Sequence, residues 1–160
     1  MGKKAEQEEL ARVIMRAAKL AKPPKSISAM RKACEKIEDE SLASLMHALM
    51  FKISGDETDL KLARAVAHSM PEGTEEKIFA KGSAIASIAK ISKTGYETLY
   101  TRMFARKVRH PLYKASLWSR IASITGKKRD LRRAESWAQK VDNPTMRNIL
   151  STMLSPPFNQ

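Results

Sequence analysis

Hydrophobic positions recur along the chain with helical spacing. Within each segment they lie three and four residues apart, which places them on one face of an α-helix. Turn-forming residues separate these segments, and alternating strand-like stretches are almost absent. The pattern predicts an all-α chain of about nine helices, near residues 5–22, 26–38, 41–54, 58–70, 74–93, 96–109, 111–125, 129–141 and 144–155.

The pattern is also an internal repeat. Segments 17–37, 50–70, 88–108 and 121–141 align without gaps, at offsets of 33, 38 and 33 residues. In each copy the second helix carries apolar or small residues at spacings of +3, +4 and +3. In chain order these positions are Ile27, Met30, Cys34 and Ile37; Leu60, Ala63, Ala67 and Met70; Thr98, Thr101, Ala105 and Val108; Leu131, Ala134, Ala138 and Val141. Because one helix pair cannot bury its apolar face alone, stacked pairs are expected.

The expected architecture is therefore a short α-solenoid of antiparallel helix pairs, with about four repeats. It forms a single helical-repeat domain over residues 5–155, with frayed tails at 1–4 and 156–160. Gly55 and Gly126 share the position after the first helix of their copies, as a C-terminal cap requires, and Lys93 occupies it in another copy. Pro111 and Pro144 suit the first turn of the helix that follows. Expected N-caps are Ser26, Thr58, Thr74 and Asn143.

One copy resembles a known repeat family. Trp118-x2-Ile121-Ala122, with Ala134 twelve residues after Ala122, is similar to the tetratricopeptide pattern Trp-x2-Leu-Gly followed by Ala. The preceding copy has Ile85 in place of the tryptophan. The resemblance implies a non-catalytic binding scaffold with a concave groove, and it carries over no ligand contacts.

Positive charge is concentrated in one repeat. The chain has a net charge of +13, and residues 96–128 hold eight basic residues against Glu97 alone. Arg102, Arg106 and Arg109 are spaced to share one helix face. Such a field favours anionic partners. The candidate binding residues are Arg102, Arg106, Arg109, Lys114, Arg120, Lys127, Lys128, Arg129, Arg132 and Arg133, with a secondary basic ladder of Lys19, Lys52, Lys90, Arg31 and Arg64.

Aromatic residues are interspersed with these cations, a combination used for single-stranded nucleic acids. They are Tyr96, Tyr100, Phe104, Tyr113 and Trp118. A simpler interpretation stands beside this one. In it, Phe104 and Trp118 belong to the core and the cations merely solvate a helix face.

No catalytic or metal motif is present in the pattern. Gly126-Lys127 is not a phosphate loop, because that motif needs glycine at 121 and Ser or Thr at 128. His47, His68 and His110 lack metal-ligand spacing, and His47 is expected to be partly buried. The acidic clusters Asp56, Glu57, Asp59 and Glu72, Glu75, Glu76 suit helix N-termini, whose dipoles favour negative charge. We therefore expect no enzyme activity and no cofactor.

Two functions remain open at this stage. The first is a basic binding module for nucleic acid, RNA or a ribonucleoprotein, dominated by backbone phosphates. The second is a tetratricopeptide-like adaptor for an acidic peptide or helix. The lone Cys34 fits a reducing compartment, and no apolar run is long enough for a membrane span, so a cytoplasmic protein is expected. The oligomeric state does not follow from the sequence.

Overall fold

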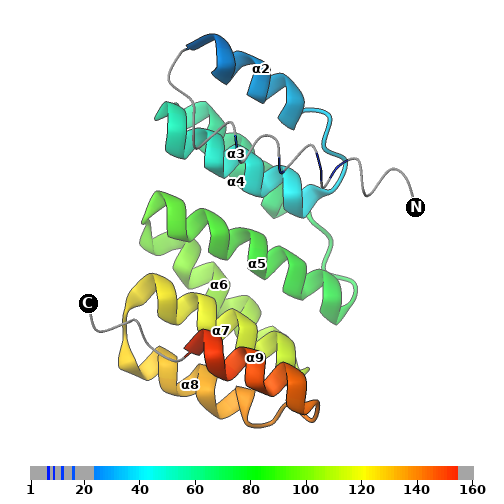
Figure 1. The fold of residues 1–160 in the computed structure, drawn as a ribbon, viewed down its shortest axis with the longest axis vertical. Coiled ribbons are helices and arrows are strands. Elements are labelled where there is room, and N and C mark those ends of the chain that lie inside the picture. Colours follow the sequence, from blue (N-terminus) through cyan, green and yellow to red (C-terminus); the bar gives the residue numbers. More distant parts are fainter. Residues whose placement is uncertain (1–6, 8, 10–11, 13–15, 17–23, 155–160) are drawn as a thin grey trace. The chain divides into compact units, whose positions relative to one another are not determined.

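The computed structural model describes residues 7, 9, 12, 16 and 24–154. Over residues 24–154 it contains eight α-helices and no strand (Figure 1). The helices are α2 (Pro24–Cys34), α3 (Glu40–Ser54), α4 (Glu57–Ser69), α5 (Glu75–Ser92), α6 (Gly95–Lys107), α7 (Pro111–Thr125), α8 (Lys128–Ala138) and α9 (Pro144–Leu154). The predicted all-α fold is confirmed. Most of the predicted helix 5–22, and both predicted tails, lie outside the described residues.

The helices group into two compact units. The N-terminal unit comprises residues 1–70 and the C-terminal unit residues 71–160. In the N-terminal unit, α3 packs against both α2 and α4. In the C-terminal unit, α7 is central and contacts α5, α6, α8 and α9. Each unit is therefore built from neighbouring helix pairs, and the single domain over 5–155 stays a prediction.

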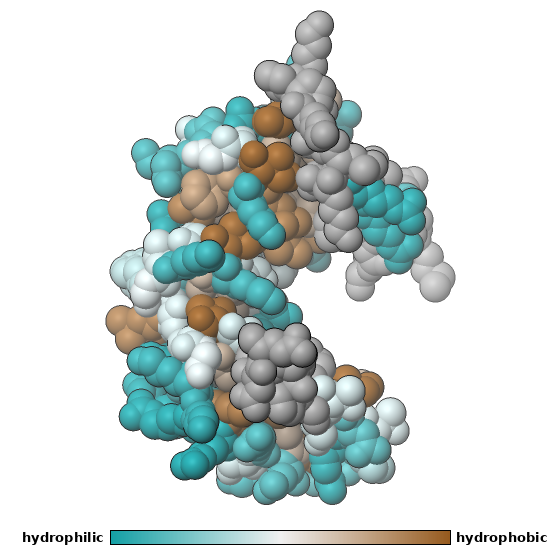
Figure 2. All heavy atoms as spheres, turned by 60° about the vertical axis from the view of Figure 1, so that its left-hand side comes forward, coloured by the Kyte–Doolittle hydropathy of each residue, from teal (hydrophilic) through white to brown (hydrophobic). Residues whose placement is uncertain are grey.

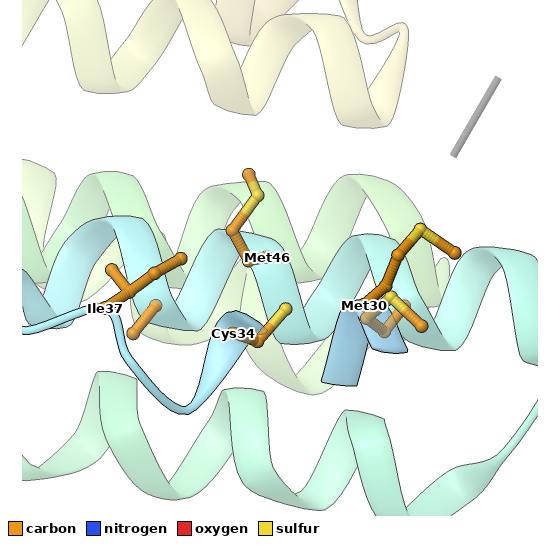
Figure 3. Packing of buried hydrophobic residues seen from close by; sticks show 6 residues of the cluster. Met30, Cys34, Ile37 and Met46 are labelled. Atoms are coloured by element: carbon orange, nitrogen blue, oxygen red, sulfur yellow. The ribbon is translucent and has the colours of Figure 1, made fainter. Parts of the chain in front are cut away.

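Small and flexible apolar side chains form the core of the N-terminal unit. Met30 and Cys34 of α2, Ile37 after it, and Met46 and Met50 of α3 are all buried (Figure 3). Methionine adapts to irregular gaps, which suits a core between short helices. Burial raises the pKa of the Cys34 thiol to about 11, so the thiol is protonated at neutral pH. Cys34 is thus a core residue, as its place in the stripe predicts.

The core of the C-terminal unit surrounds α7. Leu117, Trp118 and Ile121 of this helix are almost fully buried. Gly82 allows α5 to approach α6 closely, because a Cβ atom at this position would lie 2.8 Å from Cβ of Phe104 in α6. Packing at this density leaves no space for an extra methyl group.

The predicted apolar stripe is confirmed, although the last of its four positions lies outside the helix in each copy. The residues at its second and third positions are buried in all four copies. The closing residues Ile37, Met70, Val108 and Val141 are buried too. They nevertheless follow the ends of their helices, and Met70 and Val108 adopt extended ψ angles of 135° and 141°. The predicted ends at 38, 109 and 141 were therefore too late, because these side chains reach the core from the connecting turn.

Three turns between paired helices share one backbone geometry. The residue after the first helix is left-handed in each, with φ of 70° at Gly55, 56° at Lys93 and 64° at Gly126. Each donates its N–H to the carbonyl four residues earlier, at 2.8, 3.0 and 2.8 Å respectively. Glycine is suited to this conformation, whereas lysine is strained in it. The two predicted glycine caps are confirmed, and Lys93 forms the same cap at a conformational cost.

The helix N-caps follow the prediction in two cases of four. Thr74 accepts a hydrogen bond from the Lys77 N–H, and Asn143 accepts one from the Met146 N–H. The cap of α4 is Asp56 rather than Thr58, because its carboxylate accepts from the Thr58 N–H at 2.9 Å. Ser26 lies inside α2, which begins at Pro24. Pro111 and Pro144 begin α7 and α9 as predicted.

Replacing Lys93 by glycine should stabilise the protein. Lys93→Gly removes the left-handed strain, which outweighs the extra entropy of glycine in the unfolded chain, so we expect a gain of about 0.5–1 kcal/mol. Gly126→Ala should lose a similar amount at the equivalent position. Urea denaturation of the full chain measures both changes. A Lys93→Gly variant no more stable than the parent would contradict the assignment of strain to this turn.

Candidate nucleic-acid interface

A buried ion pair joins the two outer helices of the N-terminal unit. Asp59, in the first turn of α4, is 1% exposed. Arg31 of α2 forks onto it, with Nε donating to Oδ1 at 3.0 Å and Nη2 to Oδ2 at 2.7 Å. Ser54 Oγ also donates to Asp59 Oδ2 at 2.8 Å, and Arg31 Nη2 reaches Asp56 at 2.6 Å. The arginine is therefore held by two carboxylates.

The same pair recurs 71 residues later in the C-terminal unit. Asp130, in the first turn of α8, is 1% exposed, and Arg102 Nη2 of α6 donates to its Oδ2 at 2.6 Å. Thr125 takes the place of Ser54 and donates to the same oxygen at 3.0 Å. Here the fork is incomplete, because Arg102 Nε and Asp130 Oδ1 are buried without a hydrogen-bond partner.

The environment of Asp130 keeps its carboxylate charged. Burial alone would raise its pKa, but hydrogen bonds from Arg102 and Thr125, with the positive charges of Arg102 and Arg129, hold the pKa below its ordinary value. The sequence placed Arg31 and Arg102 among the cations that were expected to bind a partner. Both are instead committed to a buried carboxylate, and the Arg102 side chain is 23% exposed.

Sequence reasoning identified the arginines of these pairs and missed the acids. Asp59, Glu97 and Asp130 occupy one repeat position, and each is 1% exposed. The position was visible in the same alignment that placed Arg31 and Arg102 in register. It was missed because burial of a charged side chain leaves no mark in a hydropathy pattern.

Neutralising the buried aspartate should destabilise the C-terminal unit. Asp130→Asn leaves the guanidinium of Arg102 without its carboxylate, and we expect a loss of roughly 2 kcal/mol at pH 7, less than for a fully buried pair because Arg102 is partly exposed. The folded pKa of Asp130 is depressed, so its contribution is present above the unfolded pKa of about 3.9 and is lost as pH falls through the folded value.

The difference between parent and variant should therefore shrink below about pH 4. Urea denaturation across pH 3–7 tests this, with Asp142→Asn, an exposed carboxylate in the same unit, as the control. A loss at pH 3 as large as that at pH 7 would show that the pair contributes no charge-dependent stability.

The predicted arginine face of α6 is shorter than expected. Arg106 is exposed on the helix. Arg109 lies beyond the last helical residue, Lys107, and its backbone N–H donates to Glu75 at 2.8 Å. The helix ends early because Val108 adopts an extended conformation and buries its side chain. Arg102, Arg106 and Arg109 therefore do not form one face of a helix.

Two further candidate cations, Lys114 and Arg133, lie over tryptophan rings. Lys114 Nζ is 4.4 Å from the centre of the Trp137 ring, and Lys140, which is not a candidate, places its Nζ 4.2 Å from the same centre. The Arg133 guanidinium is 4.8 Å from the ring of Trp118, which is itself 4% exposed. Phe104 is buried as well, so the core interpretation of these two aromatic residues is confirmed. Neither ring presents a face to a nucleobase.

The residues of the secondary basic ladder differ in their exposure and pairing. Lys52 and Lys90 are exposed, Arg64 is half-buried and Arg31 is ion-paired. Lys19 lies outside the described residues. The remaining primary candidates, Arg120, Lys127, Lys128, Arg129 and Arg132, are all exposed.

Three of these exposed cations occupy the start of α8. Lys127 is the N-cap residue, and Lys128 and Arg129 begin the helix. No side chain caps this terminus, in contrast to α4, where Asp56 is the cap at the equivalent position. The N-terminal end of a helix carries partial positive charge, and each exposed cation there costs about 0.3–1 kcal/mol. An anion bound at this end would offset that cost.

A cleft of about 600 Å³ lies between the α5–α6 and α7–α8 turns. Its cationic lining consists of Lys90, Lys93, Arg102 and Lys127, and its hydroxyl lining of Thr94, Thr98, Ser123 and Thr125. No carboxylate is among the lining residues. In Figure 2, hydrophilic side chains cover much of the visible surface, and hydrophobic ones show as separate patches. The fold thus brings together Arg102 and Lys127 of the primary set, Lys90 of the ladder and Lys93, which sequence reasoning had considered only as a cap.

Other ionisable groups have structural partners. Lys107 and Lys81 bond Glu72 at 2.7 and 3.0 Å, and these contacts hold the pKa of Glu72 below its ordinary value. Glu75 accepts hydrogen bonds from the backbone N–H groups before α7. Burial lowers the pKa of His47, which is 8% exposed as expected of a core histidine. Glu57, Asp59, Glu75 and Glu76 lie in first helical turns as predicted, whereas Glu72 precedes its helix.

Within the described residues, no group of three or more His, Cys, Asp or Glu side chains is arranged to hold a metal ion. None of the described helices combines the length and apolar character needed to cross a membrane.

Comparison with protein-family models, curated proteins and solved structures finds no match to this chain. The tetratricopeptide resemblance is therefore carried by the residues of the repeat alone. Function has to be argued from the site.

Proposed function

We propose that this chain is a non-catalytic, tetratricopeptide-like binding module of the cytoplasm that engages nucleic acid, RNA or a ribonucleoprotein, through the C-terminal unit. The observation that supports this most directly is the exposed cluster of Lys127, Lys128 and Arg129 at the N-terminus of α8. Helix N-termini and clustered cations both favour phosphate. A polyanion fits this cluster better than a single carboxylate does, because several adjacent cations need several negative charges.

The binding surface is narrower than the ten residues of the primary set. Arg102, Lys114 and Arg133 already contact protein groups. Arg106 of α6, Arg120 of α7 and Arg132 of α8 are exposed and add to the positive charge of the C-terminal unit. Binding of this kind is dominated by the phosphate backbone and weakens steeply with salt.

Reversing two charges at the start of α8 should weaken nucleic-acid binding without unfolding the helix. Lys128→Glu/Arg129→Glu removes two cations and places acidic residues where the helix dipole favours them. For a single strand we expect the slope of log K against log salt to fall by about 1.4, and the affinity at 0.1 M salt to drop more than tenfold. Mobility shift with a single-stranded RNA at several salt concentrations measures both quantities.

The matched control is Lys36→Glu/Lys61→Glu, which makes the same change in charge on exposed residues of the N-terminal unit. An equal loss of affinity in both double variants would mean that net charge, and not this cluster, governs binding. Unchanged affinity in the α8 variant would contradict the proposed location.

A second candidate, the adaptor for an acidic helix, is favoured by one observation. Tyr96, Leu99 and Met103 of α6 are 56%, 55% and 43% exposed at spacings of +3 and +4. They form an apolar stripe on one helix face, and Arg106 follows at +3. An amphipathic acidic helix would bury this stripe and pair with the arginine.

The stripe distinguishes the two candidates. Leu99→Ser/Met103→Ser should leave RNA affinity within about twofold, because it changes no charge, and should weaken an acidic amphipathic peptide at least tenfold if the adaptor is correct. Fluorescence anisotropy with each probe measures the two affinities. Loss of RNA binding in this variant would place the apolar stripe in the nucleic-acid interface.

A further inference from the structure

We propose that the cleft between the α5–α6 and α7–α8 turns binds one phosphate group of a single-stranded nucleic acid, held chiefly by Lys93 and Lys127. This inference rests on the proposed function and assigns its central contact. Both lysines stand where the fold favours other residues.

Lys93 occupies the left-handed position of its turn. The equivalent residues in the other two described turns are Gly55 and Gly126. A solvated lysine could stand at any exposed helical position without strain. At φ 56°, by contrast, the backbone disfavours it, and this residue lines the cleft.

Lys127 occupies the N-cap position of α8. The equivalent residue in the N-terminal unit is Asp56, which caps α4 through its carboxylate. Lysine cannot accept a hydrogen bond, so it leaves the helix uncapped and adds positive charge at the positive end. Lys127 lines the same cleft as Lys93. Both departures from local preference therefore put a lysine at the lining of one cavity.

The remaining lining suits a phosphate. Lys90, which is exposed, adds a third lysine to the lining, whereas the lining residue Arg102 is already paired with Asp130. The lining hydroxyls are already bonded within the protein. Thr98 donates to Thr94 O, Ser123 to Arg120 O and Thr125 to Asp130 Oδ2, and Thr94 Oγ1 lies 3.1 Å from Ser92 Oγ. The N-cap residue of α6, Thr94, makes no side-chain cap hydrogen bond, so the cleft is bordered by two helix N-termini without side-chain caps. Phosphate oxygens accept hydrogen bonds from ammonium groups and from the unpaired backbone N–H groups of a helix N-terminus.

The position of the cleft favours an unpaired strand. It is recessed between two turns, and Tyr96 follows directly after the lining residue Gly95. Tyr96 is 56% exposed, and its ring lies beside that of Tyr100, with centroids 4.7 Å apart. Exposed aromatic side chains stack unpaired bases. In a duplex the bases are stacked on one another and are not available to such a ring. A phosphate with an adjacent unpaired base is therefore the ligand that uses both features.

Two substitutions test the cleft while improving the fold. Lys93→Gly and Lys127→Asp restore the residues found at the equivalent positions, so each variant should melt at a higher temperature than the parent. Each should nevertheless bind a fluorescein-labelled ten-nucleotide oligouridine more weakly at 0.1 M salt. We expect affinity to fall about fivefold in Lys93→Gly, which removes one cation from the phosphate, and further in Lys127→Asp, which introduces a negative charge.

Lys77→Gln is the matched control. Lys77 is exposed on α5 and is not among the lining residues, and its substitution removes one positive charge. The affinity of this variant for the oligonucleotide should stay within about twofold of the parent. Lys93→Arg, which keeps the cation, should bind the oligonucleotide more tightly than Lys93→Gly and nearly as tightly as the parent.

The outcomes separate this inference from the proposed function. Parent-like affinity in both cleft variants, with weaker binding in Lys128→Glu/Arg129→Glu, would overturn the cleft and leave the nucleic-acid interface in place. Equal competition by a duplex of the same length would overturn the single-stranded assignment.

A parent protein that binds no oligonucleotide would overturn the proposed function itself. An inorganic phosphate titration then identifies the source of the phosphate. Saturable amide shifts at Gly95 and Gly126 that are absent from Lys127→Asp would assign the cleft to a free phosphate ligand and overturn the nucleic-acid source. If the parent protein binds the oligonucleotide, the same amide shifts, together with displacement of the oligonucleotide by inorganic phosphate, would support the inference.

Discussion

A buried aspartate paired with an arginine of the preceding repeat is the constraint on which each unit depends. Asp59 and Asp130 are inaccessible to water, so each needs a cation, and an arginine from the preceding repeat supplies it. In the described helices, the second helices of consecutive repeats, α2 with α4 and α6 with α8, do not pack backbone against backbone. The arginine spans that separation and fixes the register of one repeat against the next.

The two turns that precede these aspartates have the same backbone geometry but differ in charge. Asp56 caps α4 and also meets Arg31, so that turn is satisfied within the protein. At the equivalent place Lys127 caps nothing, and the Arg102 fork is left incomplete. Consistent local choices are what specify a fold, and departures from them concentrate where a chain has another task. The C-terminal turn is therefore the place where the proposed binding function, rather than folding, would explain the residues.

Much of the fold was predictable from the sequence, because its determinants are local or repeated. The stripe through Met30, Ala63, Thr101 and Ala134 is buried throughout, and the left-handed caps at Gly55 and Gly126 lie where glycine predicts them. The helix ends were less predictable, since a buried residue such as Val108 leaves the same apolar signal inside a helix or just after it. The cleft could not be predicted, because it joins two turns about thirty residues apart whose approach depends on the packing of α7.

Lys93 and Lys127 are assigned to the proposed site because both lower the stability of the fold at their positions. A field that only keeps the protein soluble can be built from exposed helical positions such as Lys52 or Arg132, where a cation strains nothing. A left-handed lysine and an uncapped cationic helix start together cost about 1–2 kcal/mol, a sizeable fraction of the roughly 5–15 kcal/mol that holds a typical domain. Two such costs converging on one cavity are hard to attribute to net charge, since net charge is indifferent to position. The proposed phosphate ligand would account for both, because its negative charge would offset both costs when it binds.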